Sequence, residues 1–190
     1  MEEYFANRCR EMAERIRRGY LIEPPGKMML DKKYHGLLAK MNDRYFLTFD
    51  SQSENDNLGP GVAQRPYVYG VMTHEHAFDF VSRLNTSSDY IAIVIHPVQK
   101  SMADPGIDVT KTRDRIGGPW SPFTSIPLYT DQKTYHAEME DALGMDMRTL
   151  INMNNPVKLV KVCCIDPTWG RKAGNRLTKS GLFYEVIRQM

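Results

Sequence analysis

Two short segments constrain the fold of this chain more than any other feature of its sequence. Tyr90–Ile95 is apolar on both faces of an extended chain, and Val157–Ile165 is the other segment expected to be a central strand. A strand that is apolar on both faces belongs in the middle of a covered sheet. The apolar runs are far shorter than the ~20 residues needed to cross a bilayer. They therefore predict a sheet covered by helices, and no membrane-spanning segment.

Helical periodicity predicts the elements that cover this sheet. Phe5, Cys9, Met12 and Ile16 recur at steps of four, three and four, which places them on one face of a helix that Gly19 ends. Further helices are expected after the caps Asp31, Thr73 and Asp131, over a short piece ending near Met153, and from Ser180 to the end of the chain.

The order of the elements defines the expected fold class. Additional strands are predicted at Tyr45–Phe49, Tyr67–Met72 and Ser125–Tyr129. The order favours an α+β fold, with a single mixed β-sheet of about five strands and helices packed on it. The 190 residues fit one globular domain, 1–190. Within it, residues 98–123 contain several prolines and glycines and are expected to form a long irregular loop, a feature that usually serves a function.

Composition excludes several classes of protein. Lys and Arg number 25 against 23 Asp and Glu, so the charge balance predicts neither a nucleic-acid partner nor a membrane surface. The cysteines Cys9, Cys163 and Cys164 do not make a disulfide framework, which favours a reducing compartment and a cytoplasmic location. Neither a Cys-x-x-Cys nor a His-x-x-x-His pair occurs, so no metal site is expected. No Gly-x-Gly-x-x-Gly or phosphate-loop sequence follows a predicted strand, so no cofactor is expected either.

The first polar motif lies between two predicted strands. If these strands pair as antiparallel neighbours, Ser51 and Gln52 face Gln64 and Arg65. Carboxamide and guanidinium groups make directional hydrogen bonds, which suit a base edge, an amide or a phosphate. The competing interpretation is that these groups bond to the loop backbone and anchor a long connection.

The second polar motif is the turn that follows the last strand. Asp166, Trp169 and Arg171 lie where α/β sheets often bind ligands, although Asp166 and Arg171 could instead pair across the turn. If the first and last strands are parallel neighbours, both motifs share one sheet edge with His96. His96 is the candidate general base, since histidine exchanges protons near neutral pH, and a structural histidine is the alternative.

Taken in order, the motifs resemble those of a known family. The matching segments are a Gly-Leu-x-x-x-x-Asn helix (Gly36, Leu37, Asn42), a Leu-Thr-x-x-Ser-Gln strand end (Leu47, Thr48, Ser51, Gln52), a Gln-Arg-x-x-Val-x-Gly strand (Gln64, Arg65, Val68, Gly70) and an Asp-x-x-Trp-Gly-Arg turn (Asp166, Trp169, Gly170, Arg171). They resemble an uncharacterised domain family found chiefly in actinobacteria, over residues 34–72 and 160–187. The resemblance implies a common site but no activity. The 12 methionines and the long middle segment would also suit a phage or large-DNA-virus relative.

Three functional hypotheses follow. The leading one is binding of a polar, anionic small molecule, with nucleotides first among the candidates: Arg65 and Arg171 hold the anion, Gln52 and Gln64 read its polar edges, and Trp169 stacks. The second is a hydrolase or transferase acting on that ligand, so enzyme status stays open. The third is a structural or interaction protein, such as a virion or assembly component or an inhibitor. This hypothesis predicts that the chain binds a protein partner or forms a homo-oligomer.

Overall fold

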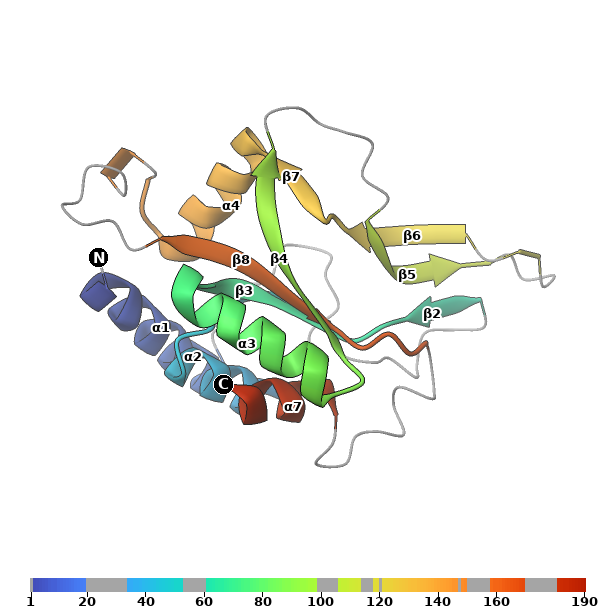
Figure 1. Cartoon of the computed structure of the whole chain (residues 1–190), viewed down its shortest axis with the longest axis horizontal. Helices are drawn as coiled ribbons and strands as arrows, with labels where there is room; N and C mark the ends of the chain where they lie inside the picture. The colour runs from blue at the N-terminus through green and yellow to red at the C-terminus, as the bar shows by residue number, and fades with distance from the viewer. Residues whose placement is uncertain are drawn as a thin grey trace.

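The computed structural model describes residues 2–19, 34–52, 61–98, 106–113, 118–119, 121–146, 148–149, 158–169 and 181–190. Figure 1 shows the arrangement of the elements. The helices are α1 (Glu2–Arg17), α2 (His35–Asp43), α3 (His74–Ser87), α4 (Gln132–Leu143) and α7 (Leu182–Gln189). The strands are β1 (Leu47–Gln52), β2 (Val62–Gln64), β3 (Tyr67–Thr73), β4 (Ile91–Val98), β5 (Ile107–Thr112), β6 (Ser121–Ile126), β7 (Tyr129–Asp131) and β8 (Leu159–Ile165).

The larger sheet has five strands in the order β1-β3-β8-β4-β7. Three of its pairings are antiparallel, and β4 pairs with β7 in parallel, so the sheet is mixed. This confirms the expected α+β fold with helices packed on a mixed five-stranded sheet. A smaller antiparallel sheet, β2-β5-β6, was not expected from the sequence.

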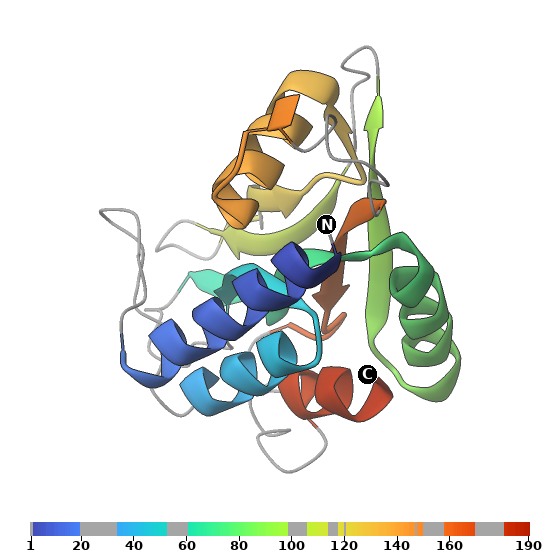
Figure 2. The same ribbon diagram turned by 90° about the vertical axis from the view of Figure 1, so that its left-hand side faces the viewer.

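The two faces of the larger sheet carry different layers. Alternate residues of a strand point to opposite faces. On β8, Val162 and Cys164 belong to the core formed with α2, α3 and α7, whereas Cys163 and Ile165 pack with β5 and β6. The helices α3 and α4 lie on opposite sides of this sheet (Figure 2).

The predicted helix caps are present at two helices. Thr73 accepts a hydrogen bond from the backbone N–H of His76, and Asp131 accepts one from that of Thr134, so each caps the helix that follows it. Gly144 ends α4 in a left-handed conformation that glycine adopts without strain. The caps expected at Asp31 and Ser180, and most of the helical piece ending near Met153, lie outside the described residues.

The expectation of an irregular loop at 98–123 was wrong for part of that segment. It contains β5, and β6 begins within it, at Ser121. Ile107 and Val109 alternate with polar residues, which is the pattern of a strand with one buried face, and Val109 is buried. The strand expected at Ser125–Tyr129 is in fact divided, because β6 ends at Ile126 and β7 begins at Tyr129.

Among the described residues, none of the helices is both long enough and apolar enough to cross a membrane.

Candidate functional site

The larger sheet brings the two polar motifs to one end. Tyr67 at the start of β3 pairs with Gln52 on β1 and, on its other side, with Ile165 on β8. One expectation required the first and last strands, β1 and β8, to be neighbours. They are not, because β3 lies between them. Since β3 is antiparallel to both, the ends of β1 and β8 nevertheless lie at the same end of the sheet.

At this end, two cationic side chains contact one indole. The guanidinium carbon of Arg65 lies 4.1 Å from the centre of the Trp169 ring, and Lys111 Nζ lies 4.2 Å from it. Arg65 follows β2, Lys111 lies on β5, and Trp169 follows β8. We call these three residues the indole cluster. Such contacts are worth about 0.5–1 kcal/mol each at exposed sites.

The Arg65 guanidinium is held partly by the backbone of β5. Its Nη1 donates to the Asp108 carbonyl at 3.1 Å, while the Arg65 backbone N–H donates to Val109 at 2.8 Å. Burial lowers the pKa of Arg65, and the carboxylates of Asp108 and Asp166 oppose that shift. Its Nε is buried and has no hydrogen-bond partner within the described ranges. Arg65 therefore has one buried N–H without a hydrogen-bond partner in the described part of the chain.

Gln52 and Asp166 bond to the protein itself. Gln52 Nε2 donates to the Arg65 carbonyl at 3.1 Å and to Thr110 Oγ1 at 3.4 Å. Asp166 is buried, and its carboxylate accepts the Thr168 backbone N–H at 2.8 Å. The Gln52 contacts fit the anchoring interpretation of the first motif, since they tie β1 to the chain after β2 and to β5, whereas the Asp166 contact lies within its own turn.

The remaining predicted site residues are not gathered in the indole cluster. Ser51 pairs with Val68, whose side chain lies in the core on the other face of the sheet. Gln64 is on β2, opposite Thr110. Arg171 lies outside the described residues.

His96 lies at the other end of the sheet. The neighbour of Ile165 on β4 is Ile91, and His96 instead pairs with Tyr129 on β7. His96 comes five positions after Ile91 (96 − 91), which at ~3.3 Å per residue places it about 17 Å along the strand. The expected convergence of His96 with the two motifs is therefore wrong.

Sequence reasoning missed Lys111 and Asp108, because both lie in the segment expected to be irregular. The alternation of Ile107 and Val109 with polar residues was the signal that could have found β5. Once β5 is a strand, its pairing with β2 brings Lys111 beside Ala63 and thus close to Arg65.

Several residues of the motifs that resemble the family stabilise the fold. Asn42 is fully buried; its Nδ2 donates to the Leu38 carbonyl at 2.8 Å and to Thr48 Oγ1 at 2.7 Å. The Thr48 backbone N–H donates to Asn42 Oδ1 at 3.2 Å. Gly70 lies against the Leu47 carbonyl, where a Cβ would come within 2.6 Å. These residues fix the connection from α2 to β1 and its contact with β3.

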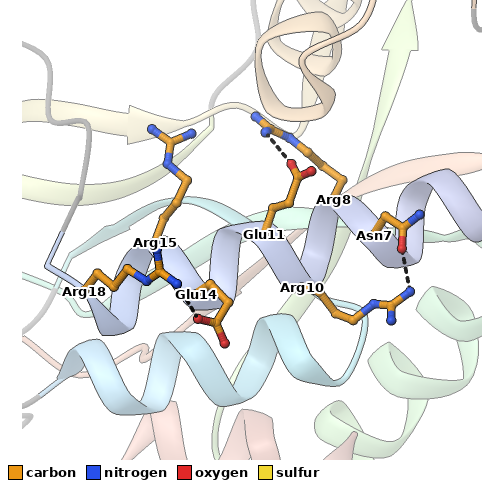
Figure 3. Close-up of a pocket in the computed structure, with 7 residues that line it drawn as sticks. All are labelled: Asn7, Arg8, Arg10, Glu11, Glu14, Arg15 and Arg18. Atoms are coloured by element: carbon orange, nitrogen blue, oxygen red, sulfur yellow. Dashed lines mark hydrogen bonds and ion pairs between the residues drawn. The ribbon is translucent and has the colours of Figure 1, made fainter.

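A separate hollow of about 580 Å³ lies on α1 (Figure 3). Glu11 forms an ion pair with Arg8, and Glu14 forms one with Arg18, so an arginine neutralises each of these two carboxylates. The hollow shares no residue with the indole cluster. Its lining residues are Asn7, Arg8, Arg10, Glu11, Glu14, Arg15 and Arg18. Among the described residues, no group of three or more His, Cys, Asp or Glu side chains is arranged to hold a metal ion.

The fold and the cluster define an α+β protein whose two polar motifs meet beside a small second sheet. The chain belongs to the family described as "Domain of unknown function (DUF6919)", whose model matches residues 31–180. This agrees with the expectation of an uncharacterised family. Comparison with curated proteins finds no match. The matched range includes every residue of the indole cluster, whereas α1 precedes it.

Proposed function

We propose that the indole cluster binds a small anionic ligand, with nucleotides as the first candidates. The observation that carries this proposal is the convergence of Arg65 and Lys111 on Trp169 at 4.1 and 4.2 Å. Two cations at one site attract an anion, and a guanidinium matches the geometry of phosphate and carboxylate oxygens.

The state of Arg65 supports the same proposal. Among the described residues, no carboxylate lies within salt-bridge distance of Arg65, and its Nε has no partner. A buried donor without a partner costs about 1–3 kcal/mol. An anion that accepts from this donor would remove that cost.

The geometry changes the role proposed for Trp169. Its ring already packs against Arg65 and Lys111, so a base would have to displace a cation in order to stack on it. We therefore propose that Trp169 positions the two cations. The primary contact of these cations is then with the phosphate of a nucleotide ligand rather than with its base. Gln52 and Asp166 position the backbone around the cluster.

The test is a thermal-shift titration with inorganic phosphate, AMP and adenosine. Phosphate and AMP should raise the melting temperature, and adenosine should not. Arg65→Met and Lys111→Met should abolish the effect, whereas Lys133→Met, which removes an exposed lysine of α4, should leave it intact. Equal shifts in wild type and Arg65→Met, or no shift with any anion, would overturn the proposal.

An interaction role is the second candidate, because Phe123 on β6 is 70% exposed. In the described part of the smaller sheet, β6 is an edge strand, and edge strands can pair with another chain. This candidate expects an oligomer by light scattering that Phe123→Ser reduces to a monomer. A monomeric wild-type protein would count against it. The catalytic hypothesis loses its proposed base, since His96 lies far from the cluster.

A further inference from the structure

A lysine lies buried in the middle of the larger sheet, outside the indole cluster. Lys161 on β8 is fully buried, and its neighbours in the sheet are Val71 on β3 and Ile95 on β4. Its Nζ forms an ion pair with Glu138 of α4. Lysine is almost never fully buried without a reason, because removing the charge from water is costly.

Aromatic rings form two walls around this amine. Lys161 Nζ lies 4.7 Å from the centre of the Tyr135 ring and 5.5 Å from that of Tyr69. Burial lowers the pKa of Lys161, while the carboxylates of Glu138 and Asp131 oppose the shift. A larger fraction of this amine is therefore neutral than at an ordinary surface lysine, and the neutral amine is the nucleophile.

The Tyr69 hydroxyl supplies the second observation. Tyr69 is only 7% exposed, and its hydroxyl has no hydrogen-bond partner within the described ranges. In that same part of the chain, Glu138 is the only hydrogen-bond partner of Lys161 Nζ. A carbonyl oxygen can accept a hydrogen bond from this hydroxyl.

Glu138 connects this centre to solvent. Its side chain is 39% exposed, whereas Lys161 is not exposed at all. Glu138 is therefore the member of the pair past which a ligand would approach the amine. The carboxylate can also take and return a proton.

We propose that Lys161, Glu138 and Tyr69 form a second site, at which Lys161 takes a small carbonyl compound as an imine. The neutral Nζ adds to the carbonyl carbon while Tyr69 donates a hydrogen bond to the carbonyl oxygen. Glu138 accepts a proton from the nitrogen and returns it to the oxygen. That oxygen then leaves as water with both protons of the amine, and a C=N bond replaces the C=O bond, with no change in oxidation state.

The experiment traps this imine in the whole chain. Wild-type protein is incubated at pH 7 with glyoxylate and sodium cyanoborohydride, which reduces an imine to a stable secondary amine, and the modified lysine is located by peptide mass mapping. We expect Lys161 to be modified faster than Lys158, an exposed lysine close to it in sequence. Tyr69→Phe should slow the modification of Lys161 roughly tenfold or more and leave Lys158 unchanged.

Two outcomes would overturn the proposal. One is that Lys161 is modified only in denaturant, or no faster than Lys158, which would make the Lys161–Glu138 pair purely structural. The other is a Lys161→Met variant that acquires the adduct as fast as wild type. Replacing a buried charge with an apolar side chain of similar size is usually tolerated, and circular dichroism checks that this variant folds.

Discussion

The guanidinium carbon of Arg65 lies 4.1 Å from the centre of the Trp169 ring, so the chain after β2 contacts the chain after β8. Both chains also contact β5, through the Arg65–Asp108 hydrogen bond and the Lys111–Trp169 contact. The indole cluster therefore joins the larger sheet to the smaller one. The interaction energy between the residues of this cluster can be measured without knowing a ligand.

Arg65 and Trp169 should be energetically coupled. In a double-mutant cycle of Arg65→Met and Trp169→Leu, we expect a coupling free energy of about 0.5–1 kcal/mol in urea unfolding. Arg83→Met, at an exposed arginine of α3, serves as the control and should be additive with Trp169→Leu. Additivity of Arg65 with Trp169 would mean that the contact contributes nothing to stability.

Asn42 should be essential to the stability of the connection from α2 to β1. Asn42→Ala removes hydrogen bonds to Leu38 and Thr48 and leaves buried polar groups without partners. The free energy of unfolding should fall by about 2–3 kcal/mol, measured by chemical denaturation. Asn7→Ala, at an exposed position of α1, should change it by less than ~0.5 kcal/mol. A small effect at Asn42 would contradict this account.

Two glycines of the shared motifs should respond to alanine in opposite directions. At Gly70 a Cβ would lie 2.6 Å from the Leu47 carbonyl and 2.6 Å from a ring carbon of Phe46, so Gly70→Ala should destabilise the fold. At Gly36, in α2, nothing lies within 4 Å of such a Cβ. Gly36→Ala should therefore raise the melting temperature, by stabilising the helix by about 0.5–1 kcal/mol. Scanning calorimetry of both variants tests the pair.

Tyr45 adopts a left-handed backbone conformation after α2, with φ of 63°. A non-glycine residue there costs about 1 kcal/mol. Tyr45→Gly should therefore stabilise the protein by up to about 1 kcal/mol in urea unfolding, since Tyr45 is about half exposed, at 47%. Tyr45→Ala keeps the Cβ and should not produce this gain. Equal stability of the two variants would mean that the backbone strain is negligible.

The buried Lys161 should make stability depend on alkaline pH. Its pKa is lower in the folded protein than the ordinary value of 10.5, so the unfolded chain binds more protons between those two values. Stability from this group therefore rises with pH across that window. The free energy of unfolding of wild type minus that of Lys161→Met should increase from pH 7 to pH 10.

The difference between the two proteins is the quantity to measure, because other buried groups titrate in the alkaline range. Burial raises the pKa of Cys9 to about 12 and raises the pKa values of Tyr67 and Tyr69 still further. These groups lower stability at high pH equally in wild type and variant, except Tyr69, which lies beside Lys161. A difference that is flat with pH would contradict the lowered pKa of Lys161.

Local patterns were sufficient to predict most helices and central strands. The apolar spacing in α1, the caps Thr73 and Asp131, and the glycine after α4 each act within one or two turns of the chain. Their effects are local, so a single sequence carries them. The hydrogen bonds of Asn42 are local too, which is why that motif could be recognised but its role could not.

Pairing between distant strands was decided by the tertiary structure. No local rule states that β3 lies between β1 and β8, that β5 pairs with β2, or that His96 lies at the opposite end from Trp169. The burial of Lys161 likewise depends on α4, which supplies Tyr135, and on the Tyr69 side chain of the neighbouring strand β3. Periodicity specifies which side of an element is apolar, whereas the identity of its neighbour depends on how all the apolar surfaces are buried together. Arg65 and Trp169 could thus be nominated from residue chemistry, but only the packed fold placed Lys111 beside them.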